Sequence, residues 1–225
     1  MNKIKVAILG TGKIGTDLLV KINKSDRLVC TLFVGRNLDS AGLQIAKNYP
    51  ATEVSDKSIQ ALLDNLDKFD VVLDCTSAQS HIKHWEALKN TDKTVIDLTP
   101  AKLGKMCVPV LNAEELIDEG IQNINMVTCG GQTALPIAHA IASVHKDIDY
   151  IEVASNIASK SAGPATRYNL DEYVETTETA LSDVTGVSKT KAILILNPAE
   201  PCIDMQTTVY SKITNPDIPA LTIAV

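Results

Sequence analysis

The chain has 225 residues, of which 45% are hydrophobic, and its 21 basic and 27 acidic residues give a net charge of -6 at pH 7. This length supports one large domain or two modest ones, and the scattered basic residues exclude the electrostatic footprint of a nucleic-acid or anionic-membrane binder. No apolar run reaches the ~18 residues of a membrane span, and the apolar stretch at the start of the sequence is too short for the hydrophobic region of a signal peptide. We therefore expect a cytoplasmic protein whose partners are small molecules or proteins.

The first half of the sequence alternates short β-branched runs with segments of helical apolar spacing. The expected strands are KVAILG, RLVCTLFVG, FDVVLDCTS, KTVIDLT and NINMVTC. The expected helices cover residues 13–23, 39–48, 56–65 and 79–89. Repeated β-α-β units of this kind predict an α/β fold with a Rossmann-type doubly wound parallel sheet and helices on both faces.

The second half has a different character. A helix over Thr133–Val144 leads into the strand-like run DIDYIEVASNIAS, and a loop with the sequence SAGPATRYN follows. A second helix starts at Leu170, where Asn169 and Glu172 have capping-box spacing, and two β-like runs, KAILILN and CIDMQTTVYSKI, come next. We therefore predict a dinucleotide-binding domain over residues 1–129 and a smaller α+β domain with an antiparallel sheet over residues 130–225.

The turn between the first strand and the first helix has the sequence GTGKIG. Gly10 would permit the tight turn, Gly12 would let a pyrophosphate approach the backbone, and Gly15 would let helix and strand pack closely. The start of the helix adds N–H groups and a partial positive charge. A merely tight turn is the alternative, but the complete β-α-β context favours a dinucleotide site.

The end of the second expected strand bears on the choice of dinucleotide. An acidic residue usually holds the ribose hydroxyls of NAD here, whereas this chain has Arg36 followed by Asn37. Arg36 could stack on adenine or meet a 2′-phosphate, so NADP is an alternative to NAD. An ordinary exposed arginine is an equally good interpretation.

Cys129 follows an apolar run and precedes two glycines. The cysteines are odd in number and lack the spacing of a disulfide framework or a zinc site, so we expect no metal site; they are Cys30, Cys75, Cys107, Cys129 and Cys202. A small buried hydrophobe is the default interpretation. For Cys129, however, Gly130 and Gly131 would leave room for a substrate, and Pro136 suits the first turn of a helix whose positive end favours the thiolate. A thiolate that follows a nicotinamide domain indicates aldehyde oxidation through a thioester.

Seven strings carry a family resemblance. In chain order they are GTGKIGTDL, VLDCTSAQSH, VIDLTPAKLG, VPVLN, NMVTCGGQTALP, IASKSAGPATRYNLDEYVETT and KAILILNPAEP. With them the chain resembles the acetylating, CoA-acylating acetaldehyde dehydrogenases over nearly all of residues 4–213. The resemblance implies conversion of acetaldehyde, NAD and coenzyme A to acetyl-CoA and NADH, often in partnership with a 4-hydroxy-2-oxovalerate aldolase. We also expect a homo-oligomer.

Matched by position, the resemblance makes Cys129 the acyl-thioester nucleophile. It places the first cofactor-binding segment at Thr11, Gly12, Lys13 and Ile14, and the second at Ser161, Ala162, Gly163, Pro164, Ala165, Thr166, Arg167, Tyr168 and Asn169. The residue types of the second segment agree, because hydroxyls, N–H groups and the Arg167 cation can bind a nucleotide or CoA phosphate. A solvated loop is the alternative.

Three departures from the family pattern bear on activity. The sequence ends at Val225, before the C-terminal part that we expect from the family, so a shortened form is expected. Gln206 and Thr207 occupy the positions of an Arg-Asp pair, and Arg36-Asn37 occupies that of an Asp. If the missing Asp activates the thiol, turnover should be low.

His81 and His84 lack ligand companions at suitable spacing and are expected to be solvated helix residues, and His139 and His145 also look like helix positions.

Two other functions are alternatives to the acylating dehydrogenase. One rival is a shortened paralogue that binds a dinucleotide or an aldolase without turnover. The other is a phosphorylating semialdehyde dehydrogenase, which would use phosphate in place of CoA.

Overall fold

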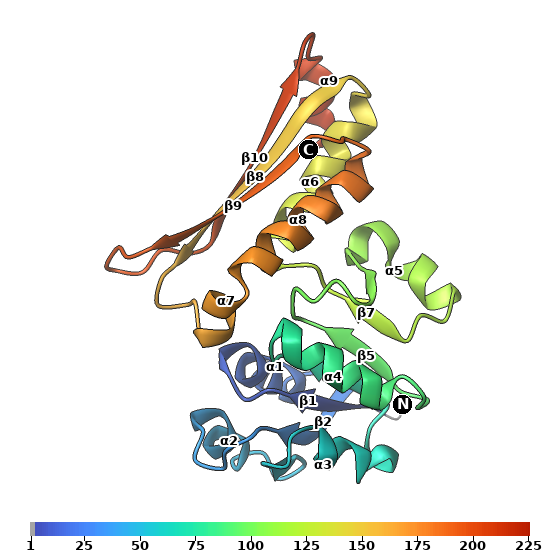
Figure 1. The fold of residues 1–225 in the computed structure, drawn as a ribbon, viewed down its shortest axis with the longest axis vertical. Helices are drawn as coiled ribbons and strands as arrows, with labels where there is room; N and C mark the ends of the chain where they lie inside the picture. The colour runs from blue at the N-terminus through green and yellow to red at the C-terminus, as the bar shows by residue number, and fades with distance from the viewer. Residues whose placement is uncertain (1–2) are drawn as a thin grey trace. The chain divides into compact units, whose positions relative to one another are not determined.

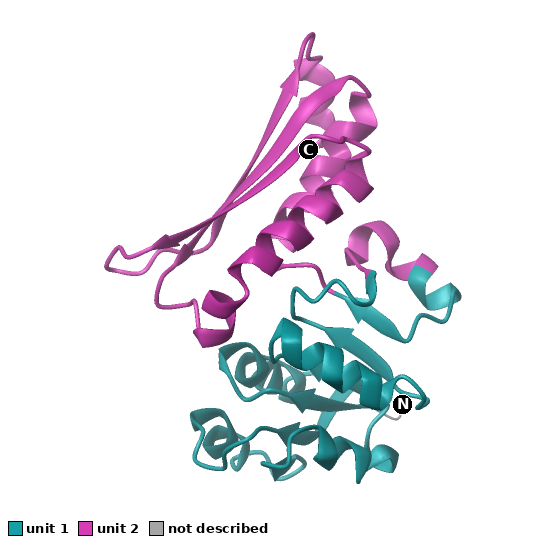
Figure 2. Cartoon of the chain, viewed as in Figure 1, with its two compact units in different colours: residues 1–105, 116–125 teal, residues 106–115, 126–225 magenta. Residues whose placement is uncertain are grey.

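The computed structural model describes residues 3–225 and divides the chain into two compact units (Figure 2). The first unit contains residues 1–105 and 116–125, and the second contains residues 106–115 and 126–225. The units thus divide the chain after residue 125 and place the segment 106–115 with the second unit. The domain boundary after residue 129 stays a prediction.

The first unit is built on a parallel sheet with the strand order β3-β2-β1-β4-β5-β7-β6 (Figure 1). Its strands are β1 (Ile4–Leu9), β2 (Leu28–Val34), β3 (Glu53–Ser55), β4 (Val71–Asp74), β5 (Thr94–Asp97), β6 (Lys105–Met106) and β7 (Asn123–Asn125). β1 pairs in parallel with β2 and with β4, and β5 pairs in parallel with β4 and with β7. This arrangement confirms the predicted Rossmann-type sheet.

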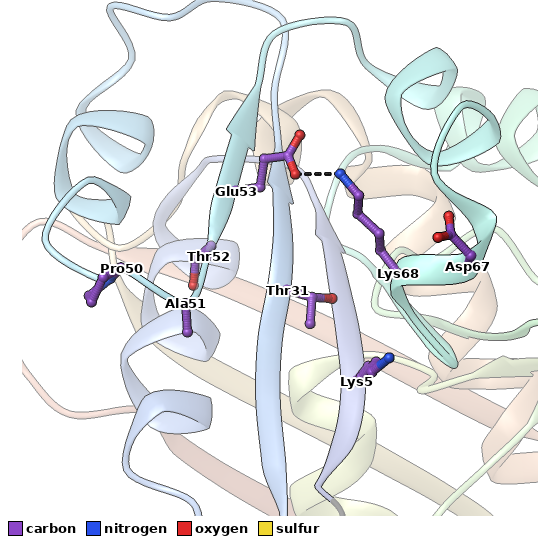
Figure 3. A pocket seen from close by; sticks show the side chains of 8 residues that line it. All are labelled: Lys5, Thr31, Pro50, Ala51, Thr52, Glu53, Asp67 and Lys68. Atoms are coloured by element: carbon purple, nitrogen blue, oxygen red, sulfur yellow. Dashed lines mark hydrogen bonds and ion pairs between the residues drawn. The ribbon is translucent and has the colours of Figure 1, made fainter.

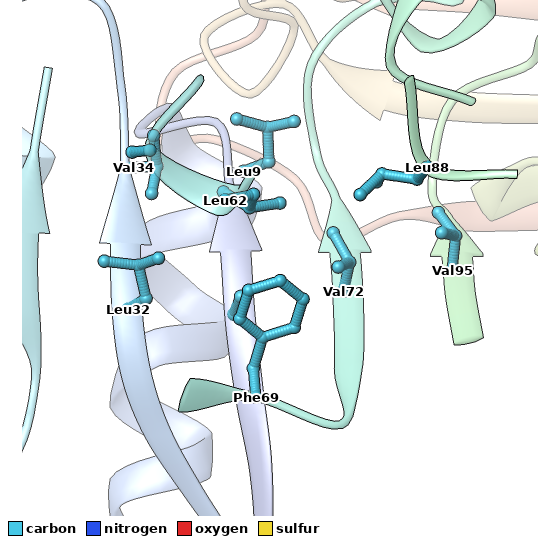
Figure 4. Close-up of a cluster of buried hydrophobic side chains, with 10 residues drawn as sticks. Leu9, Leu32, Val34, Leu62, Phe69, Val72, Leu88 and Val95 are labelled. Carbon is cyan, nitrogen blue, oxygen red and sulfur yellow. The ribbon is translucent and has the colours of Figure 1, made fainter. Parts of the chain in front are cut away.

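Helices cover both faces of this sheet. They are α1 (Lys13–Asn23), α2 (Ala41–Ala46), α3 (Ile59–Leu63), the 3-10 turn η1 (Leu66–Lys68) and α4 (Ala78–Leu88). A further helix, α5 (Pro109–Asp118), is divided between the units, since residues 109–115 belong to the second and 116–118 to the first. One core cluster joins Ile8 of β1 to Leu19 of α1 and Leu43 of α2. The other joins Leu9 to α3 and α4; its labelled members are Leu9, Leu32, Val34, Leu62, Phe69, Val72, Leu88 and Val95 (Figure 4). Because neighbouring residues of β1 contribute to opposite clusters, the sheet is doubly wound, as predicted.

The second unit packs two long helices on one face of a three-stranded sheet (Figure 1). Its elements are α6 (Cys129–Val144), β8 (Ile148–Ala158), α7 (Pro164–Tyr168), α8 (Leu170–Thr185), β9 (Thr190–Asn197), β10 (Gln206–Ile213) and α9 (Ile218–Ala224). Leu135 of α6 and Leu181 of α8 are fully buried against Ile151 of β8. Burial of each such side chain stabilises the fold by about 1.5–3 kcal/mol.

The small sheet is mixed. β8 pairs with β10 in the expected antiparallel direction but with β9 in parallel. The parallel pair follows from the connection, because α8 lies between β8 and β9 and forms a β-α-β crossover. Sequence patterns identified the strands but not the direction of this one pair.

The helices differ from expectation in several respects. α2 and α3 are shorter than the expected segments 39–48 and 56–65, and α4 is shifted by one residue from 79–89. α6 begins at Cys129 rather than Thr133, because the side chain of Thr128 accepts a hydrogen bond from the Gly131 N–H and caps the helix. α5 was not anticipated. The Asn169–Glu172 capping box does not form, since the Asn169 amide donates to the Ala165 carbonyl instead. Within residues 3–225, the structure contains no helix long and apolar enough to cross a membrane.

Candidate active site

The glycine-rich turn after β1 has the geometry that a dinucleotide requires. Gly10 has a φ of +110°, which only glycine adopts easily, and a Cβ on Gly15 would lie 1.9 Å from the Gly10 carbonyl oxygen. A Cβ on Gly12 would meet no atom within 4 Å, so this side of the turn is open. No side chain caps the N-terminus of α1, and the first-turn N–H groups of a helix point out of that end. These features fit a pyrophosphate.

The loop after β2 lies beside this turn. The Ser40 hydroxyl caps α2 and donates to the Thr11 hydroxyl at 3.1 Å. A Cβ on Gly35 would lie 2.7 Å from the Thr11 methyl group. Arg36, the next residue, is exposed. Its position at the end of β2 suits contact with the adenosine part of a dinucleotide, and this role stays a prediction.

His81 and His84 are buried, so the expectation that they are solvated is wrong. Asp74 Oδ2 lies 3.0 Å from His81 Nδ1 and 2.8 Å from His84 Nδ1. The other His81 nitrogen lies 3.4 Å from Asp97 Oδ2. Sequence spacing missed these partners because Asp74 and Asp97 end neighbouring parallel strands, β4 and β5, and face α4 only in the folded sheet.

This Asp-His cluster has perturbed ionisation. Burial alone would raise the pKa of Asp74, but the hydrogen bonds with His81 and His84 outweigh it and lower the pKa to about 2. Burial would lower the pKa of His81, but the hydrogen bond to Asp74 and the charge of Asp97 raise it. Burial raises the pKa of Asp97. The cluster ties β4, β5 and α4 together beneath the carboxyl ends of the strands.

A separate open pocket of about 450 Å³ lies on the first unit (Figure 3). It is lined by Lys5, Thr31, Pro50, Ala51, Thr52, Glu53, Asp67 and Lys68. The Lys68 ammonium and the Glu53 carboxylate pair across it at 2.5 Å. Lys5 is near the start of β1, whereas the glycine-rich turn follows its end. The pocket therefore does not belong to the dinucleotide site.

Cys129 occupies the first position of α6 and is exposed. The preceding backbone is strained, because Val127 has a φ of +58° although it is β-branched. The Thr128 cap and the buried Val127 side chain fix the turn that leads into α6. The structure thus presents this cysteine at the end of a positioned turn, as the sequence predicted.

The glycines after Cys129 have a different role from the one expected. A Cβ on Gly130 would lie 2.1 Å from the Tyr173 hydroxyl and 2.3 Å from the Ser155 hydroxyl. A Cβ on Gly131 would lie 2.8 Å from a Val127 methyl group. The space is therefore filled by the protein's own side chains rather than left for a substrate. Pro136 is also not in the first turn, since it lies inside α6.

The ionisation of Cys129 corrects a second expectation. Although the residue is exposed, desolvation by the surrounding protein raises the pKa of the thiol. The Tyr173 hydroxyl and the N–H groups of Cys129 and Gly130 oppose the increase only in part. The helix N-terminus does act on the sulfur, but it does not make the thiolate the favoured form.

Thr207 lies close to the start of α6. Its hydroxyl is 3.0 Å from that of Thr133 and 3.4 Å from that of Ser155, its register partner on β8. The Thr133 hydroxyl in turn donates to the Gly130 carbonyl at 3.0 Å. The position that departs from the family's Asp is therefore part of the surroundings of Cys129, and it carries no charge.

The second expected cofactor segment, residues 161–169, is partly helical. Residues 164–168 form α7, with Pro164 at its first turn, where the sequence suggested a loop. The Arg167 guanidinium donates to the Ser159 carbonyl at 3.1 Å and to the Ser159 hydroxyl at 3.0 Å. Tyr168 is 83% exposed, whereas Asn169 is buried. Nucleotide or CoA binding by this segment stays a prediction.

The other cysteines differ from Cys129 in their surroundings. Cys30 and Cys107 are buried, and burial raises the pKa of Cys30 to about 11. Burial also raises the pKa of Cys75 and of Cys107. Cys202 is exposed but lies in an irregular segment before β10. Within residues 3–225, no group of three or more His, Cys, Asp or Glu side chains is arranged to hold a metal ion.

Comparison with known proteins agrees with this arrangement. Residues 5–119 match the semialdehyde dehydrogenase NAD-binding domain, and residues 129–225 match the dimerisation domain of prokaryotic acetaldehyde dehydrogenase. The chain is 60% identical over 224 residues to an acetaldehyde dehydrogenase of Pectobacterium atrosepticum, covering 100% of this chain and 75% of the relative. The chain belongs to the acetaldehyde dehydrogenase family. Its members are oxidoreductases, and the resemblance noted in the sequence is confirmed.

Other relatives show the same pattern. Acetaldehyde dehydrogenases of Spirochaeta aurantia and Geobacillus stearothermophilus are 54% and 47% identical, covering 96% and 95% of this chain and 71% of each relative. Among solved structures, aspartate semialdehyde dehydrogenase with NADP from Candida albicans covers 99% of this chain and 76% of its own, with a TM-score of 0.73 and 13% identity. The match to GenD2 from gentamicin A biosynthesis, in complex with NAD, covers 95% of this chain and 71% of the GenD2 chain, with a TM-score of 0.63 and 15% identity. These two structures share the fold.

Sequence reasoning missed two residues of the cysteine site. Tyr173 of α8 and Ser155 of β8 lie beside the first turn of α6. Tyr173 is 43 positions from Gly130, and no motif links them. The one indication in the sequence was the pair Gly130 and Gly131. Adjacent glycines at a helix start indicate that other atoms, from the protein or from a ligand, approach the backbone closely.

Proposed function

We propose that this protein oxidises acetaldehyde, or another short aldehyde, to the acyl-CoA with NAD, through a thioester on Cys129. The observation that carries the proposal is the thiol itself: it is exposed, it is the first residue of α6, and N–H groups of Cys129 and Gly130 act on its sulfur. Family membership supports aldehyde oxidation. The acyl acceptor and the thioester belong to the proposal.

Cys129 provides the covalent chemistry. Its thiol first loses a proton to solvent, and the thiolate sulfur adds to the carbonyl carbon while the C=O π electrons move to oxygen. When bound, the nicotinamide supplies the acceptor for the hydride that leaves this carbon. The acyl group then stays on Cys129 until the CoA thiol loses its proton to solvent and its sulfur attacks the same carbon. The bond to Cys129 breaks, and the electron pair returns to its sulfur.

Residues of the first unit would hold the dinucleotide. The open side of Gly12 and the N-terminus of α1 suit the pyrophosphate, with Thr11, Lys13 and Ile14 around it. Arg36 would contact the adenosine, and it leaves NADP as an alternative. In the second unit, Ser161–Asn169 would contact nucleotide or CoA phosphate through hydroxyl and N–H groups.

A second candidate, a dinucleotide-binding protein with little turnover, is favoured by one observation. The groups that oppose desolvation of Cys129 are a hydroxyl and two backbone N–H groups, all uncharged. Neither Thr207 nor Ser155 can accept a proton at neutral pH. Both candidates share the dinucleotide site and differ only in the rate of the thiol chemistry.

The proposed assembly is a homo-oligomer formed through the second unit. Thr207 and Ser155 face the helices, so the residues that alternate with them lie on the other face of the sheet. There Tyr210 is 54% exposed and Ile195 is 45% exposed. The match to a dimerisation domain supports this face as the contact. An aldolase that supplies the aldehyde is a further proposed partner, on the family resemblance alone.

One assay tests the proposed function. Purified protein is mixed with acetaldehyde and NAD, and the NADH absorbance is followed with CoA, with inorganic phosphate, or with neither. CoA-dependent NADH formation that disappears in Cys129→Ser is expected. A phosphate-dependent rate without a CoA requirement would identify a phosphorylating enzyme instead. Dinucleotide binding without NADH formation under any condition would support the second candidate.

A further inference from the structure

Tyr173 has a buried hydroxyl without a partner. The residue lies in the first turns of α8 and is 6% exposed, and its Oη atom is inaccessible to solvent. Oη makes no hydrogen bond in the structure, although the hydroxyls of Ser155 and Thr128 and the sulfur of Cys129 are near enough to alter the ionisation of the phenol. Phenylalanine would fill the same space without leaving a polar atom unsatisfied, so the hydroxyl at this position requires a reason.

The hydroxyl is directed at the start of α6. A Cβ on Gly130 would lie 2.1 Å from Oη, so glycine at position 130 is what allows the phenol to reach this point. Cys129 is the adjacent residue, and the Tyr173 hydroxyl and the Cys129 sulfur each alter the ionisation of the other. The phenol therefore borders the reacting sulfur of the proposed function.

The other elements around this turn bring uncharged groups. β8 contributes Ser155, β10 contributes Thr207 and the cap contributes Thr128. The Thr128 hydroxyl is already occupied, since it accepts from the Gly131 N–H and lies 2.8 Å from the Thr177 hydroxyl. Ser155 and Thr207 lie 3.4 Å from each other. Tyr173 is thus the buried side chain whose O–H is uncommitted beside Cys129.

We propose that Tyr173 is a catalytic residue whose Oη–H donates a hydrogen bond to the sulfur of Cys129 when the thiolate forms. The proposal rests on the proposed function of Cys129. The thiol proton leaves to solvent and Tyr173 keeps its own proton, so no proton passes through the phenol. The donor has no committed partner in the thiol state and gains one in the thiolate state, which favours the reactive form.

The ionisation of Tyr173 agrees with a donor role. Burial first, and then the charge of the Cys129 thiolate, raise the pKa of Tyr173 to about 12. The phenol therefore remains protonated through the neutral range, where it can donate but cannot act as a base.

The test measures the pH dependence of Cys129 alkylation by iodoacetamide, with peptide mapping, in the wild type and in Tyr173→Phe. Loss of the donor should move the midpoint up by about one pH unit, which makes alkylation below the midpoint about tenfold slower. Tyr49→Phe, which removes a hydroxyl from a half-buried tyrosine of the first unit, should leave the midpoint in place. The thermal midpoint of Tyr173→Phe should not fall, because no existing hydrogen bond is lost. An unchanged alkylation midpoint in Tyr173→Phe would overturn the proposal.

A second measurement does not depend on that variant alone. Biosynthetic replacement of tyrosine by 3-fluorotyrosine strengthens the O–H donor and should move the Cys129 midpoint downward, and this shift should vanish in the Tyr173→Phe background. A downward shift that persists in that background contradicts the proposal. Turnover that survives Cys129→Ser would refute the proposed function itself. Loss of turnover in that variant, with no effect of Tyr173→Phe on the alkylation midpoint, would refute only the role of Tyr173.

Discussion

The hydroxyl oxygens of Thr207 and Thr133 lie 3.0 Å apart, which places β10 next to the first turn of α6. Thr133 also donates to the carbonyl of Gly130, the residue after Cys129. The Thr133 hydroxyl therefore lies between the side chain of residue 207 and the backbone next to Cys129. The chemistry of position 207 should influence the rate of the reaction.

The first prediction concerns a carboxylate at this position. Gln206→Arg combined with Thr207→Asp should raise turnover with acetaldehyde and CoA, because a positioned general base typically contributes about 10² to 10⁴ in rate. The matched control is Gln206→Arg with Thr207→Asn, which has the same shape but accepts no proton at neutral pH. Equal rates in the two variants, or a wild-type rate already near the common enzyme value of about 10 per second, would show that the carboxylate is not needed.

The second prediction separates two glycines of the same turn. Gly12→Ala should leave the unfolding midpoint nearly unchanged, because the added Cβ meets nothing within 4 Å, but it should weaken dinucleotide binding about tenfold or more. Gly15→Ala should instead destabilise the fold, because its Cβ would lie 1.9 Å from the Gly10 carbonyl oxygen. Titration of NADH fluorescence and urea unfolding distinguish the two. Normal dinucleotide affinity in Gly12→Ala would remove this turn from the binding site.

The third prediction addresses the choice between NAD and NADP. Arg36→Asp should shift the ratio of the two affinities towards NAD, since a carboxylate can accept from the ribose hydroxyls and repels a 2′-phosphate. Arg27→Asp makes the same charge change just before β2, at the end opposite to Arg36. Titration of both dinucleotides against the three proteins decides the question. If the two variants change the ratio equally, net charge rather than contact is responsible.

The fourth prediction concerns the buried Asp-His cluster. Asp74→Asn should lower the free energy of unfolding by about 3 kcal/mol or more, because it removes one partner of a buried ionic network. Asp17→Asn, which breaks an exposed ion pair with Lys21, should cost about 1 kcal/mol or less. Urea unfolding at neutral pH compares the two. Equal costs would mean that the cluster does not stabilise the fold.

The same cluster predicts how stability depends on pH. The folded-state pKa of Asp74 is about 2, below its unfolded value, so its contribution is present above about pH 4 and is lost as the pH falls towards 2. The pKa of His81 is raised, so its contribution is present below about pH 6.5 and is lost as the pH rises through the folded-state value. Both losses should be smaller in Asp74→Asn. Parallel stability curves for the two proteins would contradict this.

Local sequence patterns predicted the architecture well where the structure of an element depends on the residues of that element alone. The alternation of β-branched runs and helices gave the doubly wound sheet, and α1 starts and ends at the expected residues. Local sequence patterns failed where burial, strand direction or a side-chain contact depends on residues that are distant in the sequence. The burial of His81, the parallel β8–β9 pair and the contact of Tyr173 with Gly130 each depend on strand order or helix packing, which residue spacing does not encode.

The candidate site shows the same division. Gly10, Gly12 and Gly15 have the conformations that their motif implies, because a strand-turn-helix motif is local. The position of Cys129 at a helix start also followed from neighbouring residues. The pKa of its thiol did not, since desolvation by surrounding elements outweighs the local effect of the helix N-terminus.

The most direct test of the central claim is the intact mass of the protein after incubation with acetaldehyde and NAD in the absence of CoA. An acetyl adduct that maps to Cys129 is expected, because without an acceptor the thioester has no partner to open it. Addition of CoA should then remove the adduct and release acetyl-CoA. NADH formation without any adduct on Cys129, or with the adduct on another cysteine, would contradict the account.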